Sequence, residues 1–340
     1  MTDSQLLLSL AAAVPAALLS AVLTWAIRPL MMRVALARPN ARSSHRVPTP
    51  QGAGIAVIAA TLISAAAVIA LAGTARTAMP FAVFGATLFI AGVGFADDIK
   101  SIPVVPRLSL QALAVAAVIL PPPEASRIAP ACPLWIERGL LLLVGLWFVN
   151  LVNFMDGLDL MTVAEIVPIT GAIILLGTVI DFPAAATIAA TALFGAMLGF
   201  APFNRPVAKI FLGDVGSLPI GLLAGWFLLQ LAWHQHLTAA LLLPLYYLAD
   251  ATVTLLRRIA RREPFWEGHR SHFYQRATEN GFSVFRVVSE VFALNLVLAA
   301  LAIGSAMTSS TAISILLFVI GGIATALLMH RFSRRRVAAG

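Results

Sequence analysis

Five aspartates and one asparagine lie in three short segments, each where a long apolar run begins or ends. They are the Asp97-Asp98 pair, the stripe Asn153-Asp156-Asp159, and Asp214. An ionised aspartate at the centre of a bilayer costs about 2.5–3.5 kcal/mol on insertion scales, and the chain has only 15 acidic residues. We therefore expect these five carboxylates to form one site.

The Asp97-Asp98 pair follows an apolar run and precedes Pro103, which is expected to stop a helix. Adjacent carboxylates repel one another, which raises one of the two pKa values. Such a pair suits a general base or a site for a divalent cation. The alternative is a solvated helix end that forms a salt bridge with Lys100.

Asn153, Asp156 and Asp159 are three residues apart, so a helical backbone would place them on one face, and Asn150 extends the same stripe. Oxygen side chains on one face suit a hard cation such as Mg²⁺, which takes few protein carboxylates and completes its shell with substrate phosphates. Gly157 would let a ligand or another backbone approach closely. The alternative is an N-cap cluster at the start of the next helix.

Asp214 stands in the segment Gly-Asp-Val-Gly-Ser, which reads as a junction between a loop and a helix. Free backbone N–H groups at such a junction and the Ser217 hydroxyl could hold a phosphate group. A turn with an N-cap aspartate would have a similar sequence.

Residues 261–276 form a long basic segment that contains His269, Arg270 and His272 among aromatic residues. The guanidinium group of arginine can form two parallel hydrogen bonds to a diphosphate, and aromatic rings can enclose a sugar or base. The alternative is an interfacial amphipathic segment. Asp250 lies inside a predicted span, where packing against an inward arginine or lysine and a catalytic role are both open.

The composition predicts an all-α polytopic integral membrane protein. Hydrophobic residues make up 60% of the chain, charged residues 11%, and the mean hydropathy is +0.93. Apolar runs of about 20 residues recur along residues 1–340 with no soluble domain between them, which predicts a single transmembrane domain of about eleven spans, with ten as the alternative. No cleavable signal peptide is evident. The expected centres are Val14, Thr61, Leu88, Val115, Leu143, Ile174, Thr191, Gly225, Pro244, Leu296 and Leu316.

Basic residues predict the orientation. All but three of the 23 lysines and arginines fall on one side of the alternating spans, and the exceptions are Arg76, Arg127 and Arg138. The positive-inside rule makes that side cytoplasmic and leaves the N-terminus outside. Every acidic segment falls on the same side, so we expect a cytoplasmic active-site cleft. A net charge of +8 confined to short loops favours anionic lipid headgroups and an anionic substrate over nucleic acid. The single cysteine, Cys132, excludes an intrachain disulfide.

In this order, the segments resemble those of the polyprenyl-phosphate N-acetylhexosamine-1-phosphate transferases, the glycosyltransferase family 4 enzymes that include MraY and WecA. The resemblance also covers residues 38–54, with His45, and so extends over nearly the whole chain. It implies transfer of N-acetylhexosamine-1-phosphate from a UDP-sugar to undecaprenyl phosphate at the bacterial inner membrane. UMP would be released and a lipid-linked surface glycan begun.

The resemblance also implies roles for individual residues. Asn153 and Asp214 resemble the ligands of Mg²⁺, with Mn²⁺ as an alternative ion. Asp97 or Asp98 resembles the base acting on the lipid phosphate, and Asp156 and Asp159 resemble catalytic residues that contact the nucleotide and the metal shell. The implied partners are UDP-N-acetylhexosamine, undecaprenyl phosphate, the lipid bilayer and a possible homodimer. The expected substrate contacts are His45, Asn150, Ser217, His269, Arg270 and His272.

The sequence departs from this family at several positions. Leu160 stands where a glycine is usual, and Gln51 and Ala53 replace a common arginine and glycine. The segment 268–275 lacks the triple histidine of the MraY type, so it is more similar to transferases that start O-antigen or other surface glycans. UDP-MurNAc-pentapeptide is therefore disfavoured as substrate.

The sequence alone also allows other classes of membrane protein. A polytopic secondary transporter would carry its ionisable groups near the midplane of repeated helices, whereas here they gather at one face. A lipid phosphatase or CDP-alcohol phosphotransferase is a further alternative, which release of UMP would exclude.

Overall fold

The computed structural model describes residues 3–37, 48–72, 79–123, 126–263 and 270–335. Almost all regular structure in these residues is helical, which confirms the all-α prediction. The elements in chain order are α1 Asp3–Val34, β1 Leu36–Ala37, β2 Thr49–Pro50, α2 Gly54–Ala72, α3 Phe81–Ile99, α4 Val104–Ile119, α5 Leu134–Met155, α6 Met161–Val179, α7 Ala184–Phe200, a 3₁₀ turn Ala201–Phe203, α8 Asp214–Trp233, α9 Leu237–Leu242, α10 Leu245–Ala260, α11 Phe273–Glu279, α12 Val284–Met307 and α13 Thr311–Ser333.

Nine of the described helices are long and apolar enough to cross a membrane: α1, α2, α3, α5, α6, α7, α8, α12 and α13. Helix α4 is also apolar but has 16 residues. The chain is therefore a multi-pass membrane protein. Ten of the eleven expected centres lie inside one of these ten helices.

The ninth expected span is not one continuous helix. It consists of the 6-residue α9 and the 16-residue α10, with Pro244 immediately before α10. Proline has no backbone N–H and its ring crowds the preceding turn, so it favours a break at this position, although Pro168 and Pro219 stand inside the continuous helices α6 and α8. Helix α10 ends with Arg257 and Arg258 in its last turn.

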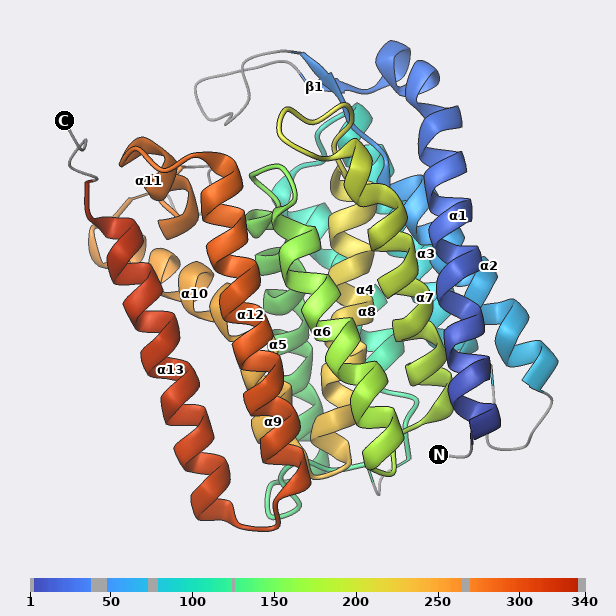
Figure 1. Cartoon of the computed structure of the whole chain (residues 1–340), viewed down its shortest axis with the longest axis vertical. Coiled ribbons are helices and arrows are strands. Elements are labelled where there is room, and N and C mark those ends of the chain that lie inside the picture. Colours follow the sequence, from blue (N-terminus) through green and yellow to red (C-terminus); the bar gives the residue numbers. More distant parts are fainter. Residues whose placement is uncertain (1–2, 38–47, 73–78, 124–125, 264–269, 336–340) are drawn as a thin grey trace.

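The helices run side by side, with α8 in the centre and α1 and α13 at the periphery (Figure 1). Helix α1 begins at one end of the bundle and α13 ends at the other (Figure 1), as an odd number of crossings requires. Helices α1 and α7 approach closely because Gly195 and Gly199 of α7 lie against backbone carbonyls of α1, and the Ser20 hydroxyl donates to the Ala196 carbonyl (2.8 Å).

A short loop assembly closes the end of the bundle at which α3 and α5 terminate. Strands β1 and β2 pair antiparallel, and Gln51 then forms a parallel bridge with Phe211. The N–H groups of Gly52 and Gly54 donate to the carbonyls of Phe211 (3.1 Å) and Leu212 (2.9 Å). These bonds place the start of α2 beside the start of α8, where Asp214 lies.

Candidate active site

The Asp98 carboxylate caps helix α8. Its Oδ1 accepts from the backbone N–H of Asp214 (2.9 Å) and its Oδ2 from that of Val215 (3.0 Å). Free N–H groups at a helix N-terminus favour a negative charge, so this carboxylate stabilises the start of α8 from the end of α3. Gly213 has φ +76°, and a Cβ there would lie 2.6 Å from Asp98 Oδ2, so glycine suits both the backbone and the contact.

Three more glycines bring α2, α3 and α8 into backbone contact around Asp214. A Cβ at Gly94 would overlap the Asp214 carbonyl, and a Cβ at Gly54 would overlap the backbone of Gly216. Gly216 in turn lies against the Leu212 side chain and the Cα of Gly54. Because backbone cannot move aside as a flexible side chain can, these contacts fix the position of Asp214 relative to α3.

Asp97 points away from Asp98 into a different set of contacts. Its Oδ2 accepts from Arg107 Nη1 (2.8 Å) at the start of α4, and its Oδ1 accepts from the Ile102 N–H (2.5 Å). The adjacent carboxylates thus reduce their repulsion by separating. The Asp97 side chain also neighbours the Asp214 side chain, and the two carboxyl groups interact. Among the described residues, the basic side chain that pairs with Asp97 is Arg107 and not Lys100.

Asn153, Asp214 and Ser217 meet between α5 and α8. Asn153 Nδ2 donates to Asp214 Oδ1 (2.7 Å) and to Ser217 Oγ (2.9 Å). The predicted convergence of the second and third acidic segments is therefore present in the structure. With Asp97 and Asp98, the cluster joins side chains from the ends of α3 and α5 and the start of α8.

Asp156 lies directly after α5 and is held by Thr162 in the first turn of α6, whose hydroxyl donates to Asp156 Oδ1. Desolvation raises the pKa of the Asp156 carboxyl to about 7, although the Thr162 bond opposes the shift, and the charges of Asp98 and Asp159 raise it further. A carboxyl group that titrates near neutral pH suits general acid–base chemistry.

Asp159 completes the stripe at the turn before α6. Its Oδ2 accepts from the Ala208 N–H (3.0 Å), which ties this turn to the loop that leads to α8. The next residue, Leu160, has φ +64° and donates its N–H to Asn204 Oδ1 (2.7 Å). The left-handed conformation disfavours residues with a Cβ, which explains in physical terms why glycine is usual there in the family that the sequence resembles.

Asn150 lies one turn deeper in the bundle than Asn153 and faces α4. Its Nδ2 donates to Gln111 Oε1 (2.7 Å) and to the Leu146 carbonyl (2.8 Å), and both side chains are buried. Asn150 thus connects α5 to α4 and does not bond to the Asn153–Asp214 cluster.

The basic segment after α10 carries the other expected substrate contacts. His272 is buried and bonds through Nδ1 to Asp250 Oδ1 (3.2 Å), so the partner of Asp250 is a histidine and not the expected arginine or lysine. Arg270 is part of a polar cavity of about 280 Å³ between α10 and α11. Two further expected contacts, His45 and His269, lie outside the described residues.

Arginines outnumber carboxylates in the lining of this polar cavity. Among the described residues, Arg270 shares the lining with four other arginines and with Glu263 and Glu279. Arg258 pairs with Glu263 (2.9 Å), and Arg270 lies 3.8 Å from Glu279. The excess of positive charge makes the cavity suitable for a phosphate or diphosphate group.

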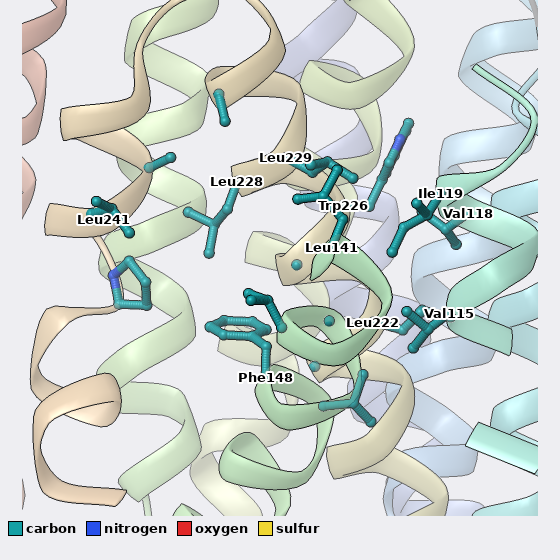
Figure 2. Close-up of a pocket in the computed structure, with 18 of the residues that line it drawn as sticks. Val115, Val118, Ile119, Leu141, Phe148, Leu222, Trp226, Leu228, Leu229 and Leu241 are labelled. Carbon is teal, nitrogen blue, oxygen red and sulfur yellow. The ribbon is translucent and has the colours of Figure 1, made fainter. Parts of the chain in front are cut away.

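An apolar cavity of about 200 Å³ lies between α4, α5, α8, α9 and α10. Figure 2 shows Val115, Phe148 and Leu222 among the side chains that surround it. Its lining also includes Val149 and Gly221, which stand one helical turn from Asn153 and Ser217 respectively. The lining of the cavity therefore begins about one helical turn from the polar cluster.

The donor set fits a magnesium ion. Mg²⁺ prefers oxygen ligands and takes only one or two protein carboxylates when substrate phosphates complete its shell. Asp214 and Asn153 supply a carboxylate and an amide in contact, and the Asp97 carboxylate lies beside them. Among the described residues no group of three or more His, Cys, Asp or Glu side chains could hold a metal ion. Side chains of these four types alone therefore do not form a metal site in this part of the chain.

Residues 80–232 match the sequence model of glycosyl transferase family 4. This segment runs from α3 through almost all of α8 and contains all five aspartates of the site. This part of the chain is similar to that family. The matched region thus coincides with the helices that build the Asn153–Asp214 cluster.

Individual relatives extend the likeness beyond the matched segment. The decaprenyl-phosphate N-acetylglucosaminephosphotransferase of Mycobacterium tuberculosis is 28% identical over 318 residues, which cover 82% of this chain and 77% of the relative. The enzyme of the same name from Mycobacterium leprae is 27% identical, with coverage of 76% and 73%. The phospho-N-acetylmuramoyl-pentapeptide-transferase of Mycobacterium marinum is 28% identical, with coverage of 64% and 75%.

Several residues that build the site were not expected from the sequence. Arg107, Gln111 and Thr162 each bond directly to a predicted site residue, and Tyr274 donates to the Phe154 carbonyl (3.0 Å). Arg107 and Gln111 are polar residues in and near an apolar run, which is a signal that sequence reasoning could have used. Thr162 and Tyr274 are ordinary residues in their local context and gave no such signal.

Proposed function

We propose that the protein is a phosphosugar transferase that moves a hexosamine-1-phosphate from a UDP-sugar to a polyprenyl phosphate and releases UMP. The observation that carries the proposal is the cluster of Asn153, Asp214 and Asp97 next to an apolar cavity, on the segment that matches glycosyl transferase family 4. A polar cluster suits phosphate chemistry, and an apolar cavity within one turn of it suits a lipid chain.

The two substrates would approach from different sides of the cluster. The apolar cavity would receive the isoprenoid chain of the acceptor, so that its phosphate reaches the Asn153 and Ser217 side chains one turn away. The basic cavity with Arg270 would hold the diphosphate of the sugar nucleotide. Phosphoryl transfer needs mainly correct placement of the reactants and neutralisation of charge, and this arrangement offers both.

The chain's own residues would act as follows. Asp98 holds the start of α8, and with it Asp214, in a fixed position. Asp97, which is paired with Arg107, would accept a hydrogen bond from the acceptor phosphate or take its proton. Asp156 would take up or release a proton near neutral pH.

Mg²⁺ is the proposed cofactor, with Mn²⁺ as an alternative, and Asn153 and Asp214 are its proposed ligands. When bound, the ion would neutralise the charge on the transferred phosphate. Asp97 would face the same ion from α3.

The finer assignments are proposals as well. We propose undecaprenyl phosphate as the acceptor and a UDP-N-acetylhexosamine as the donor. The basic segment differs from the MraY type, which disfavours UDP-MurNAc-pentapeptide as this donor. The product would begin an O-antigen or similar surface glycan. The protein would lie in the bacterial inner membrane with the site on the cytoplasmic side, where most of its arginines would also lie.

The test uses purified protein in detergent micelles with undecaprenyl phosphate, Mg²⁺ and a panel of UDP-sugars, with UMP and lipid products measured by mass spectrometry. The proposal predicts UMP and a lipid diphosphate sugar with at least one UDP-N-acetylhexosamine. Release of CMP from a CDP-alcohol, or of inorganic phosphate from the lipid, would instead support a different enzyme class.

A further inference from the structure

Asp250 is a fully buried carboxylate of α10 that caps the short helix α11. Its Oδ1 accepts from the backbone N–H of Phe273 (3.0 Å), and its Oδ2 accepts from the backbone N–H of Tyr274 (3.1 Å). These two N–H groups open α11. One residue of α10 therefore fixes where the chain turns into α11, directly after the Arg270 and His272 positions.

Three side chains of the described residues also bond to Asp250. The Tyr246 hydroxyl donates to Oδ2 (3.2 Å) and the Thr254 hydroxyl to Oδ1 (3.2 Å), one turn before and one turn after Asp250 on α10. His272 Nδ1 bonds to Oδ1 (3.2 Å), and its ring stacks on Tyr274 with centroids 5.7 Å apart. Because burial of a charge is unfavourable unless it is hydrogen-bonded, five donors account for the stability of this carboxylate in the interior.

The same segment also contacts the stripe Asn153-Asp156-Asp159, through the side chain of Tyr274. The Tyr274 hydroxyl donates to the carbonyl of Phe154 (3.0 Å), the residue directly after Asn153. A Cβ at Gly157 would overlap the Tyr274 hydroxyl, so glycine is required for this approach. Asp250 is thereby connected to the end of α5 through a single residue, Tyr274.

We propose that Asp250 is a positioning residue that holds the segment 270–275 in the geometry that binds the sugar nucleotide. The inference rests on the proposed function, since it assigns the Arg270 side of the site to the UDP-sugar. Asp250 itself is fully buried and would not touch the substrate. It would act by keeping the α11 cap formed and, through Tyr274, by keeping this segment against α5.

The variant Asp250→Asn tests the inference because the two backbone donors use different oxygens. An asparagine has one oxygen and one NH₂ group, so either Phe273 or Tyr274 must then direct its N–H at another donor. Hydroxyl groups can rotate and accept from the NH₂ group, whereas backbone N–H groups cannot. Tyr246→Phe is the matched control, since it removes one donor from the same carboxylate and leaves the α11 cap in place.

Hydrogen–deuterium exchange of peptides covering residues 270–280 measures the cap without any need for turnover. We expect exchange in these peptides to be at least tenfold faster in Asp250→Asn and to change less than threefold in Tyr246→Phe. In the transferase assay, Asp250→Asn should raise KM for the UDP-sugar at least tenfold and KM for the lipid less than threefold. Equal exchange in both variants and wild type, or a rise in the lipid KM alone, would overturn the inference.

Two additions keep the test decisive. If Asp250→Asn does not fold, Tyr274→Phe serves as a second variant, because it removes only the bond to the Phe154 carbonyl. It should raise KM for the UDP-sugar with unchanged membrane insertion. An unchanged KM would overturn the inference. Calorimetric binding of UDP-N-acetylglucosamine separates this inference from the proposed function. Wild-type protein that binds the nucleotide and releases no UMP contradicts the proposed function, whereas wild-type affinity in Asp250→Asn contradicts only the role of Asp250.

Discussion

Replacing Asp98 with asparagine distinguishes a structural cap from a catalytic base. The sequence alone assigns either member of the Asp97-Asp98 pair to proton transfer, but in the structure both oxygens of Asp98 accept from backbone N–H groups of α8. Asparagine keeps the size of the side chain and one acceptor. It presents an NH₂ group to the N–H of either Asp214 or Val215, and one of the two bonds is lost.

The size of the effect follows from these two bonds. A hydrogen bond to a charged group contributes about 1.5–3 kcal/mol, and a negative charge at a helix N-terminus contributes about 0.3–1 kcal/mol more. Loss of the charge also removes repulsion from Asp97 and Asp214, which opposes part of this effect. We therefore expect a net loss of about 2 kcal/mol in the free energy of unfolding.

The assay combines stability, amide exchange and turnover. Unfolding in mixed micelles measures the loss of stability, and exchange of peptides that cover residues 213–218 measures the cap itself. Asp97→Asn is the control, because Asp97 accepts from Ile102 and Arg107, whereas the backbone N–H groups that open α8 donate to Asp98. Asp98→Asn should accelerate exchange in these peptides and Asp97→Asn should not. Unchanged stability and exchange together with lost turnover would refute the capping role and make Asp98 the base.

Three further predictions test the site and its orientation. Asp214→Asn keeps the size of the side chain but removes the charge that a hard cation prefers, so turnover should fall by orders of magnitude with the protein still folded. If the variant kept more than about a tenth of wild-type turnover, the loss of transition-state stabilisation would be below about 1.4 kcal/mol and Asp214 would not belong to the metal site. Arg270→Ala should raise KM for the UDP-sugar far more than KM for the lipid, and a rise in the lipid KM alone would reassign the basic segment. In a Cys132→Ser background, single cysteines are introduced as Ser126→Cys and Ser101→Cys. In intact cells a membrane-impermeant thiol reagent should label the Ser126→Cys variant and not the Ser101→Cys variant, and labelling of Ser101→Cys would show that the predicted orientation is reversed.

The convergence of the acidic segments was predictable because each one stands at the end of an apolar run. A membrane forces successive spans to alternate in direction, so the parity of the spans places residues 97–98, 153–159 and 214 at the same end without any knowledge of packing. The hydrogen bond between Asn153 and Asp214 confirms this prediction. The same parity did not depend on whether the ninth span is continuous.

The partners of individual side chains were not predictable in this way. Asp98 bonds to N–H groups 116 and 117 residues away, and the pattern of either segment holds no information on the rotation of α3 against α8. The break at Pro244 was visible as a proline, but an apolar run of the right length around it favoured one span. Leu160 shows that a departure from a family pattern can mark strain, since it occupies a left-handed conformation that glycine would adopt at less cost.

The fate of the β-phosphorus of the donor tests the central claim most directly. With UDP-N-acetylhexosamine labelled with ³²P at the β-phosphorus, purified protein, Mg²⁺ and undecaprenyl phosphate, a transfer of hexosamine-1-phosphate carries the label into the organic phase and leaves unlabelled UMP in water. We predict that the label enters the lipid in a one-to-one ratio with UMP. Label that stays in the aqueous phase as UDP while sugar enters the lipid would show transfer of the sugar alone and would contradict the account.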